Sequence, residues 1–91
     1  MDEDIELAID APAGIIDCRL EPQRSDAGLY YAATILYPNM VNGYNRSEIY
    51  CHNMHSAAGG YRFEESGDIH PKIKLLEAQL SAAIIKARGG K

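Results

Sequence analysis

The segment Cys51-His52-Asn53-Met54-His55 holds the residues of this chain best suited to chemistry. Thiolate and imidazole groups are good ligands for zinc and copper, so this segment could contribute to a metal site. It has the composition of a β-strand, in which successive side chains point to opposite faces, so Cys51 and His55 are expected on one side and His52 on the other. A metal or small-molecule site around Cys51, His52 and His55, in a binding protein or an enzyme, is therefore our second functional hypothesis.

Other catalytic arrangements find less support in the sequence. A nucleophilic cysteine needs an adjacent base with its own orienting partner, and the spacing around Cys18 and Cys51 predicts neither. Glu64 and Glu65 are expected in water, where paired carboxylates are of little use for acid–base catalysis. The glycine pairs fall at turns and at the chain end, without the form of a phosphate-binding loop. The residues thus favour a non-catalytic protein and indicate no cofactor.

Alternating polarity and β-branched or aromatic content predict five strands. They are residues 5–10, 15–21, 29–37, 46–54 and 61–64. Pro22 and Pro38 are expected to close the second and third strands, because proline cannot donate a ladder hydrogen bond. Asn42-Gly43 predicts a tight hairpin turn, since both central positions of a type I′ turn need positive φ. Residues 21–28 and 56–60 are typical of turns as well.

A helix is predicted from Asp68 to Arg88, with Asp68 as its N-cap and Gly89 after its end. Its apolar residues fall on two opposite faces at about 100° per residue. One face can cover a sheet, and it holds Ile69, Ile73, Leu76, Leu80, Ala83, Ile84 and Ala87. The other face is left over, and it holds Leu75, Ala78, Ala82 and Ile85.

Short turns join strands that are neighbours in space, so these elements predict an α+β fold. We expect an antiparallel β-meander of four to five strands with a single C-terminal α-helix packed on one face, in one domain spanning residues 1–91 with flexible ends at 1–4 and 89–91. The sheet side of the core is expected to contain Ile16, Cys18, Leu20, Leu29, Tyr31, Ala33, Ile35, Ile49, Cys51, Tyr61 and Phe63.

The second helix face predicts a homodimer. Leu75, Ala78, Ala82 and Ile85 are spaced by three, four and three residues, as in a short coiled-coil seam, and the alanines would let two helices approach closely. The alternative is that alanine is simply a good helix former, and that Leu75 and Ile85 are covered by a loop or by the strand at 5–9 of the same chain.

The face of the sheet away from the helix provides the leading functional hypothesis. It is expected to carry Arg19, Tyr30, Thr34, Leu36, Tyr50, His52, Met54 and Arg62. Tyrosine, methionine and arginine are enriched where proteins meet other proteins. We therefore expect a small homodimeric, non-catalytic protein-binding or regulatory module, whose larger protein partner contacts Arg19, Tyr30, Tyr50, His52 and Arg62. The alternatives are an ordinary solvated face, or stacking on nucleic-acid bases, which the acidic total disfavours.

Charge is distributed unevenly along the chain, whose formal total is −4. Residues 1–26 hold eight acids against two bases, and residues 70–91 hold five bases against one acid. This pattern favours docking of the N-terminal segment near the helix of the same or a neighbouring chain, or two solvated surfaces. No run is long and apolar enough for a membrane span, the acidic start is unlike a signal peptide, and both cysteines suit a reducing compartment. A cytoplasmic location is expected.

Overall fold

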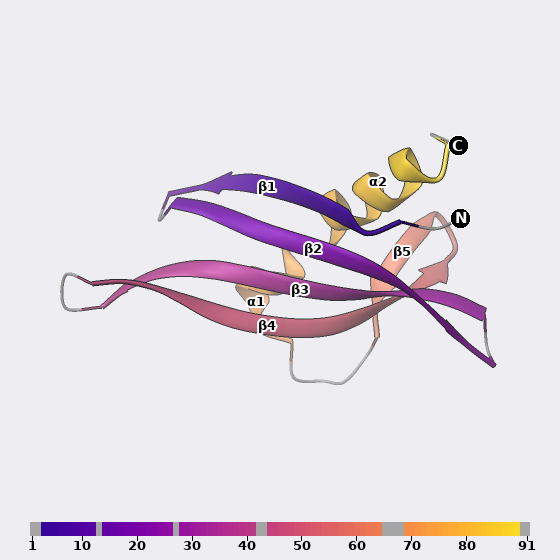
Figure 1. The fold of residues 1–91 in the computed structure, drawn as a ribbon, viewed down its shortest axis with the longest axis horizontal. Helices are drawn as coiled ribbons and strands as arrows, with labels where there is room; N and C mark the ends of the chain where they lie inside the picture. The colour runs from indigo at the N-terminus through magenta and orange to yellow at the C-terminus, as the bar shows by residue number, and fades with distance from the viewer. Residues whose placement is uncertain (1–2, 13, 27, 42–43, 65–68, 90–91) are drawn as a thin grey trace.

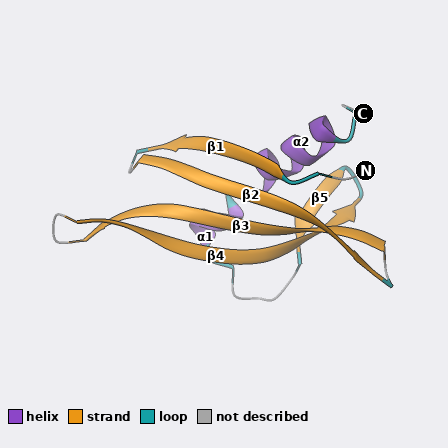
Figure 2. Cartoon of the chain, in the orientation of Figure 1, coloured by secondary structure: helices purple, strands orange, loops and turns teal. Residues whose placement is uncertain are grey.

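A computed structural model describes residues 3–12, 14–26, 28–41, 44–64 and 69–89. Its elements are β1 (Ile5–Ala11), β2 (Gly14–Ser25), β3 (Gly28–Val41), β4 (Tyr44–Ala57), β5 (Gly60–Phe63), α1 (Pro71–Lys74) and α2 (Glu77–Ala87). The strands form one curled antiparallel sheet in the order β1-β2-β3-β4-β5, and the helices lie behind it in the view of Figures 1 and 2. The predicted α+β meander is confirmed. Of the ends predicted to be flexible, residues 1–2 and 90–91 lie outside the described part.

The second and third strands run past the prolines that were expected to close them. Pro22 pairs with Tyr31 and Pro38 pairs with Ser47 inside the ladders. Because the first residue of β1, Ile5, pairs with Leu20, Pro22 lies where β2 has a neighbour on one side only. An edge position of this kind tolerates a missing N–H. The prediction that proline ends these strands was therefore wrong.

The register of the β3–β4 hairpin decides which residues enter the core. The ladder pairs Val41 with Tyr44, while Asn42 and Gly43 lie outside the described residues. Tyr31 is consequently opposite Met54, and both side chains are fully buried, Met54 at 0% exposure. Even-numbered positions of β4 from Glu48 to Met54 therefore face the helices.

The predicted burial of Ile49 and Cys51 and the predicted exposure of Met54 were wrong, because the alternation along β4 is shifted by one residue from the predicted one. Ile49 and Cys51 were expected in the core, but both are exposed, whereas Met54 was expected outside and is buried. Because side chains alternate, a shift of one residue exchanges the two faces completely. The observed buried core consists of Ile9, Ile16, Cys18, Leu20, Tyr31, Ala33, Ile35, Met54, Phe63, Ile73, Leu76, Leu80 and Ile84.

The helix begins later than expected. Pro71 is its first residue, and the ring nitrogen Nδ1 of His70 accepts a hydrogen bond from the N–H of Lys72 at 3.2 Å as the N-cap. Asp68, the predicted cap, lies outside the described residues. In the described part of the chain, neither helical segment has the length and apolar character needed to cross a bilayer.

A bend separates α1 from α2, where one continuous helix was predicted. The N–H of Leu76 bonds to the carbonyl of Ile73, three residues back, at 2.9 Å. A three-residue step aligns the side chains at its two ends, so Ile73 and Leu76 both enter the core. Leu75 points outward in consequence and is 79% exposed.

α2 covers the outer edge of β5. The hydroxyl oxygen of Ser81 accepts a hydrogen bond from the N–H of Tyr61 at 2.9 Å, and the Oε2 atom of Glu77 accepts one from the N–H of Phe63 at 2.8 Å. Gly60 permits this approach, because a Cβ at that position would lie 2.4 Å from the Ser81 oxygen. An edge that would otherwise present free N–H groups is thereby closed by side chains.

Candidate functional site

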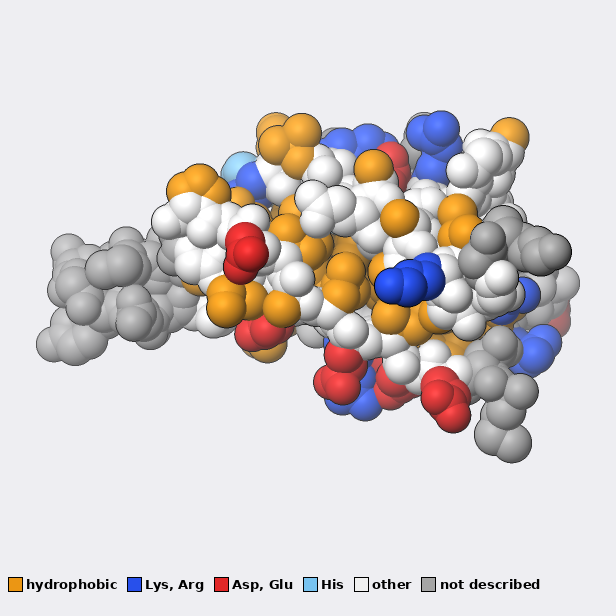
Figure 3. All heavy atoms as spheres, turned by 90° about the horizontal axis from the view of Figure 1, so that it is seen from above, with side chains coloured by type: hydrophobic (Ala, Val, Ile, Leu, Met, Phe, Trp, Pro, Cys, Tyr) orange, Lys and Arg blue, Asp and Glu red, His pale blue; other side chains and the backbone are white. Residues whose placement is uncertain are grey.

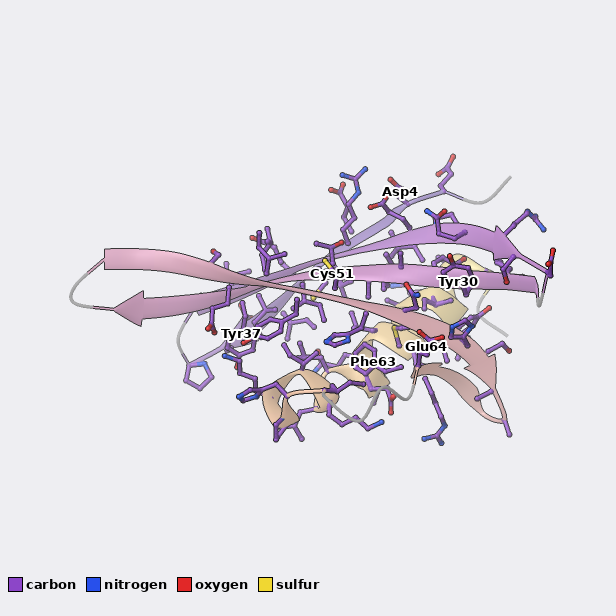
Figure 4. The ribbon with its side chains drawn as sticks, turned by 90° about the horizontal axis from the view of Figure 1, so that it is seen from below. Asp4, Tyr30, Tyr37, Cys51, Phe63 and Glu64 are labelled. Atoms are coloured by element: carbon purple, nitrogen blue, oxygen red, sulfur yellow. The ribbon has the colours of Figure 1, made fainter. Side chains whose placement is uncertain are left out.

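The helices leave one face of the sheet uncovered, which we call the open face. Figure 4 shows Cys51 and Asp4 directed to the side away from the helices, and Tyr37 and Phe63 on the helix side. Strand alternation and the ladder registers assign to the open face Glu6, Ala8, Asp10, Ile15, Asp17, Arg19, Glu21, Tyr30, Ala32, Thr34, Leu36, Ile49, Cys51, Asn53 and His55.

Four apolar residues form a contiguous surface on the open face, which we call the apolar patch. Leu36 lies directly opposite Ile49 in the β3–β4 ladder, and Ile15 and Cys51 occupy positions diagonal to Leu36. Ile15, Leu36 and Ile49 are 56%, 37% and 67% exposed, and Cys51 is exposed as well. Exposed aliphatic side chains that gather in one place indicate an interaction surface more strongly than the same residues scattered singly.

A shallow hollow of about 670 Å³ adjoins the apolar patch through Leu36. Its lining comprises Glu6, Leu7, Ala8, Asp17, Cys18, Arg19, Thr34 and Leu36. The guanidinium of Arg19 is bound to the Asp4 carboxylate at 2.6 Å, and this hydrogen bond raises the pKa of Arg19. Burial, with a contribution from Asp17, raises the pKa of Cys18 to about 11. Cys18 is therefore a neutral thiol at physiological pH, without nucleophilic character.

The other end of the open face is aromatic and polar. The rings of Tyr30 and His55 stack with centroids 5.1 Å apart, and His55 Nε2 lies 3.5 Å from the Glu64 carboxylate. Arg62 is the ladder partner of His55, and its guanidinium also lies 4.0 Å from Glu77. The predicted partner-binding residues Arg19, Tyr30 and Arg62 are thus distributed along the open face and its β5 edge.

Tyr50 and His52, predicted to join that same surface, lie on the helix-bearing face instead. The hydroxyl of Tyr50 donates to the Glu48 carboxylate at 3.1 Å, and the His52 ring lies 5.6 Å from the ring of Phe63. The face predicted for both was wrong, because the sequence analysis assigned the two faces of β4 the wrong way round, as it did for Met54. Their part in binding a partner stays a prediction, but it would belong to a second surface.

The cysteine and histidines of β4 do not converge. Cys51 and His55 share the open face but are four residues apart on a strand, about 13 Å, and His52 is on the opposite face. Within the ranges that the structure describes, no three His, Cys, Asp or Glu side chains group closely enough to hold a metal ion. One chain therefore cannot bring Cys51, His52 and His55 onto a single ion.

The predicted dimer residues divide into two groups at the helix bend. Leu75 precedes α2 and projects into solvent. Ala78, Ala82 and Ile85 line a groove of about 340 Å³ between α2 and β5. Ile85 is half-buried there, and its Cδ1 atom would lie 3.6 Å from a Cβ placed on Gly60. The four side chains do not form one straight seam.

Charge is separated across the sheet. Figure 3 views the molecule along the edge where β1 and α2 lie, and acidic side chains gather mainly along its lower border, the side of the open face. Lysine and arginine side chains lie along the upper border, the side of the helices, and some also lie at the centre, at the right end and on the lower border. The side of the open face is therefore the more acidic, and the side of the helices is the more basic.

Comparisons of this chain with protein-family models, with curated proteins and with solved structures give no match. The function is therefore argued from the geometry and charge of its own residues.

Proposed function

We propose that this protein is a non-catalytic protein-binding module and that its binding surface is the open face. The observation that carries this proposal is the apolar patch, where Leu36 and Ile49 lie side by side at 37% and 67% exposure. The core does not need these side chains, because the helices already cover the opposite face of the sheet. Covering them with a partner would remove apolar surface from water at a gain of roughly 25 cal/mol per Å².

The charge around the apolar patch indicates the chemistry of the partner. Glu6, Asp10 and Asp17 lie on the same face, and the one arginine within the hollow, Arg19, is already bound to Asp4. The partner is accordingly a protein segment that combines aliphatic side chains with lysine or arginine. Complementary charge of this kind would mainly accelerate association and select the partner.

The proposal includes homodimerisation through the outer side of the helix. Its support is Leu75 at the helix bend, the most exposed of the large apolar side chains in the described residues. Beyond the bend, Ala78 and Ala82 are also exposed, in the groove between α2 and β5. The proposal also includes a cytoplasmic location, supported by the exposed free thiol of Cys51, which a reducing compartment preserves.

Site-directed photocrosslinking tests the open face. Cys51 is exposed and Cys18 is buried, so a benzophenone maleimide labels the native protein at the apolar patch. The labelled protein is irradiated in extract of its own cells, and the crosslinked segment of the captured protein is sequenced. A synthetic peptide of that segment is then titrated against the unlabelled protein, its Ile49→Asp variant, and a Leu75→Glu variant as the matched control on the helix side.

The proposal predicts an aliphatic and basic segment whose peptide binds the parent protein and the Leu75→Glu variant equally, and binds the Ile49→Asp variant at least about ten-fold more weakly. A segment without lysine or arginine, or equal binding to the Ile49→Asp variant, would overturn it.

Light scattering on the purified protein tests the dimer separately. The expected mass is that of two chains, falling to one in the Leu75→Glu variant, while the Ile49→Asp variant keeps the dimer. A single-chain mass for the unmodified protein at high concentration contradicts the dimer without affecting the open-face proposal.

A further inference from the structure

A lysine ammonium group lies against two aromatic rings and a carboxylate on the helix-bearing face, and we call these three receiving groups, Tyr37, Glu48 and Tyr50, the cluster. The Nζ atom of Lys72 lies 4.4 Å from the centroid of the Tyr37 ring and 5.3 Å from that of Tyr50. It also donates a hydrogen bond to the Oε1 atom of Glu48 at 2.7 Å. One cation is thus in contact with two ring faces and a carboxylate.

The three receiving groups all belong to the sheet. Tyr37 and Glu48 are ladder partners in the β3–β4 hairpin, and Tyr50 lies two residues further along β4, so the three side chains share one face. The hydroxyl of Tyr50 donates to the same Glu48 oxygen at 3.1 Å and orients it. Lys72 comes from α1, a segment of four residues. The sheet therefore supplies the two rings and the carboxylate, and a separate element supplies the cation.

The chemistry of the cluster suits an ammonium group that still carries N–H bonds. Aromatic faces attract a cation at such distances, because the ring face has a negative electrostatic potential. The hydrogen bonds from Lys72 and Tyr50 lower the pKa of Glu48, so its carboxylate is ionised at neutral pH and requires a donor. A quaternary ammonium would satisfy the rings but would leave that carboxylate with the hydrogen bond from Tyr50 alone.

The cluster is partly exposed to solvent. The side chain of Lys72 is 28% exposed and that of Glu48 is 42% exposed. A second ammonium group can therefore reach the carboxylate when Lys72 moves away. The position of the cluster on the helix-bearing face makes it independent of the open face and of the function proposed for it.

We propose that Tyr37, Glu48 and Tyr50 form a binding site for a primary alkylammonium group, and that Lys72 is its resident, displaceable occupant. The ligand is either the lysine side chain of a partner protein or a small primary amine, which present the same group to the site.

A Lys72→Ala variant vacates the site, and Lys86→Ala is the matched control, because it removes the same charge from an exposed position of α2. Each is titrated with n-butylammonium chloride, with tetramethylammonium chloride at equal ionic strength, and with N-acetyl-lysine methylamide, following the ring proton resonances of Tyr37 and Tyr50. The expected result is saturable butylammonium binding that is about ten-fold tighter in Lys72→Ala than in Lys86→Ala, because a site filled nine-tenths of the time loses about that factor in apparent affinity. Tetramethylammonium should bind more weakly, and adding Glu48→Gln to Lys72→Ala should abolish the preference.

The comparison between the two primary amines distinguishes the sources. Tighter binding of the lysine derivative indicates a protein partner, tighter binding of butylammonium indicates a free amine, and both support the site. Tyrosine resonances of a folded Lys72→Ala variant that do not shift with either amine would overturn it.

The unmodified protein provides a second measurement should Lys72→Ala not fold. Ring currents should shift the ε-methylene protons of Lys72 upfield, and an excess of butylammonium should return them toward ordinary lysine values while those of Lys86 stay constant. Ordinary shifts of Lys72 at the start, or an upfield shift that excess amine leaves unchanged, would contradict a displaceable occupant.

Discussion

The hydroxyl oxygen of Ser81 accepts a hydrogen bond from the backbone N–H of Tyr61 at 2.9 Å, so a helix side chain takes the place of a neighbouring strand. Glu77 does the same for Phe63. Four residues of helix advance about 6 Å and two residues of strand about 6.6 Å, so these two pairs match in spacing. The β5 edge therefore depends on two side chains whose removal has measurable consequences.

Ser81→Ala should lower the free energy of unfolding by about 1–3 kcal/mol, because it leaves the Tyr61 N–H without its partner. Urea denaturation measures the change. Ser47→Ala, at an exposed position of β4, should change it by less than about 0.5 kcal/mol. Equal effects of the two substitutions would show that the bond to Tyr61 contributes nothing.

Gly60→Ala should be more destabilising than Gly28→Ala, by about 1–3 kcal/mol. Gly60 and Gly28 both have positive φ, 150° and 117°, so alanine is strained at either position because its Cβ disfavours this backbone conformation. Only at Gly60 would the new methyl group also meet α2, 2.4 Å from the Ser81 oxygen, whereas nothing lies within 4 Å at Gly28. Thermal unfolding of the two variants in parallel isolates this contact, and indistinguishable values would contradict it.

Met54→Ala and Ile49→Ala test the face assignment of β4. Met54 is fully buried, so its truncation should cost about 2–5 kcal/mol, whereas the change at the exposed Ile49 should stay within about 0.5 kcal/mol. The reverse order in chemical denaturation would contradict this assignment and would favour the face expected from the sequence, with Ile49 in the core and Met54 outside.

Stability should fall in acid because of Glu77. Burial by itself would raise the pKa of this carboxyl, but the N–H of Phe63, Lys74 and Arg62 outweigh it, and the net result is a pKa below the ordinary 4.5. A carboxyl with a lowered folded pKa contributes stability above its unfolded value, and that contribution is lost as pH falls through the folded value.

Glu77→Gln keeps an acceptor for Phe63 and should reduce the slope of unfolding free energy against pH below 4.5. Glu48, whose pKa is also lowered, by Lys72 and Tyr50, should retain part of the slope. A Glu77→Gln profile that overlays the parent protein would refute the role given to the carboxylate.

Alkylation should distinguish the two cysteines. Cys51 is exposed, while burial raises the pKa of Cys18 from 9.0 to about 11. At pH 8 the fraction of Cys18 present as the reactive thiolate is therefore about 100-fold smaller than for a thiol with the ordinary pKa of 9.0. Iodoacetamide followed by mass spectrometry of tryptic peptides should show early modification at Cys51 alone in the folded protein. In denaturant the two rates should become similar, and similar rates in the folded protein would be inconsistent with the structure.

The sequence was sufficient for the order and type of the elements, because alternation and turn residues act locally. It also contained the register that the strand-by-strand interpretation missed. The two-residue turn predicted at Asn42-Gly43 implies a pair between Val41 and Tyr44, which the ladder contains, and counting back along both strands pairs Tyr31 with Met54. Alternation shows which residues of a strand share a face, but the partner strand decides which of the two faces is buried.

The capping of β5 by Ser81 and Glu77 carries no comparable local signal. Ser81 reads as an ordinary helix surface residue, and Gly60 reads as a turn residue. Their roles arise when the helix bends at Leu76 and docks on a strand 20 residues earlier in the chain. The same bend separates Leu75 from Ala78, Ala82 and Ile85, with which a straight helix would have aligned it. The 3.6-residue period alone therefore could not predict that these four side chains form two groups.

The separation of acids and bases across the sheet gives this molecule an electric dipole through its thickness. A positively charged body that approaches from any direction exerts a torque that turns the acidic side toward it before contact. Encounters would then be biased toward one orientation at distances up to about 10 Å in 0.1 M salt, and that bias would vanish at high ionic strength.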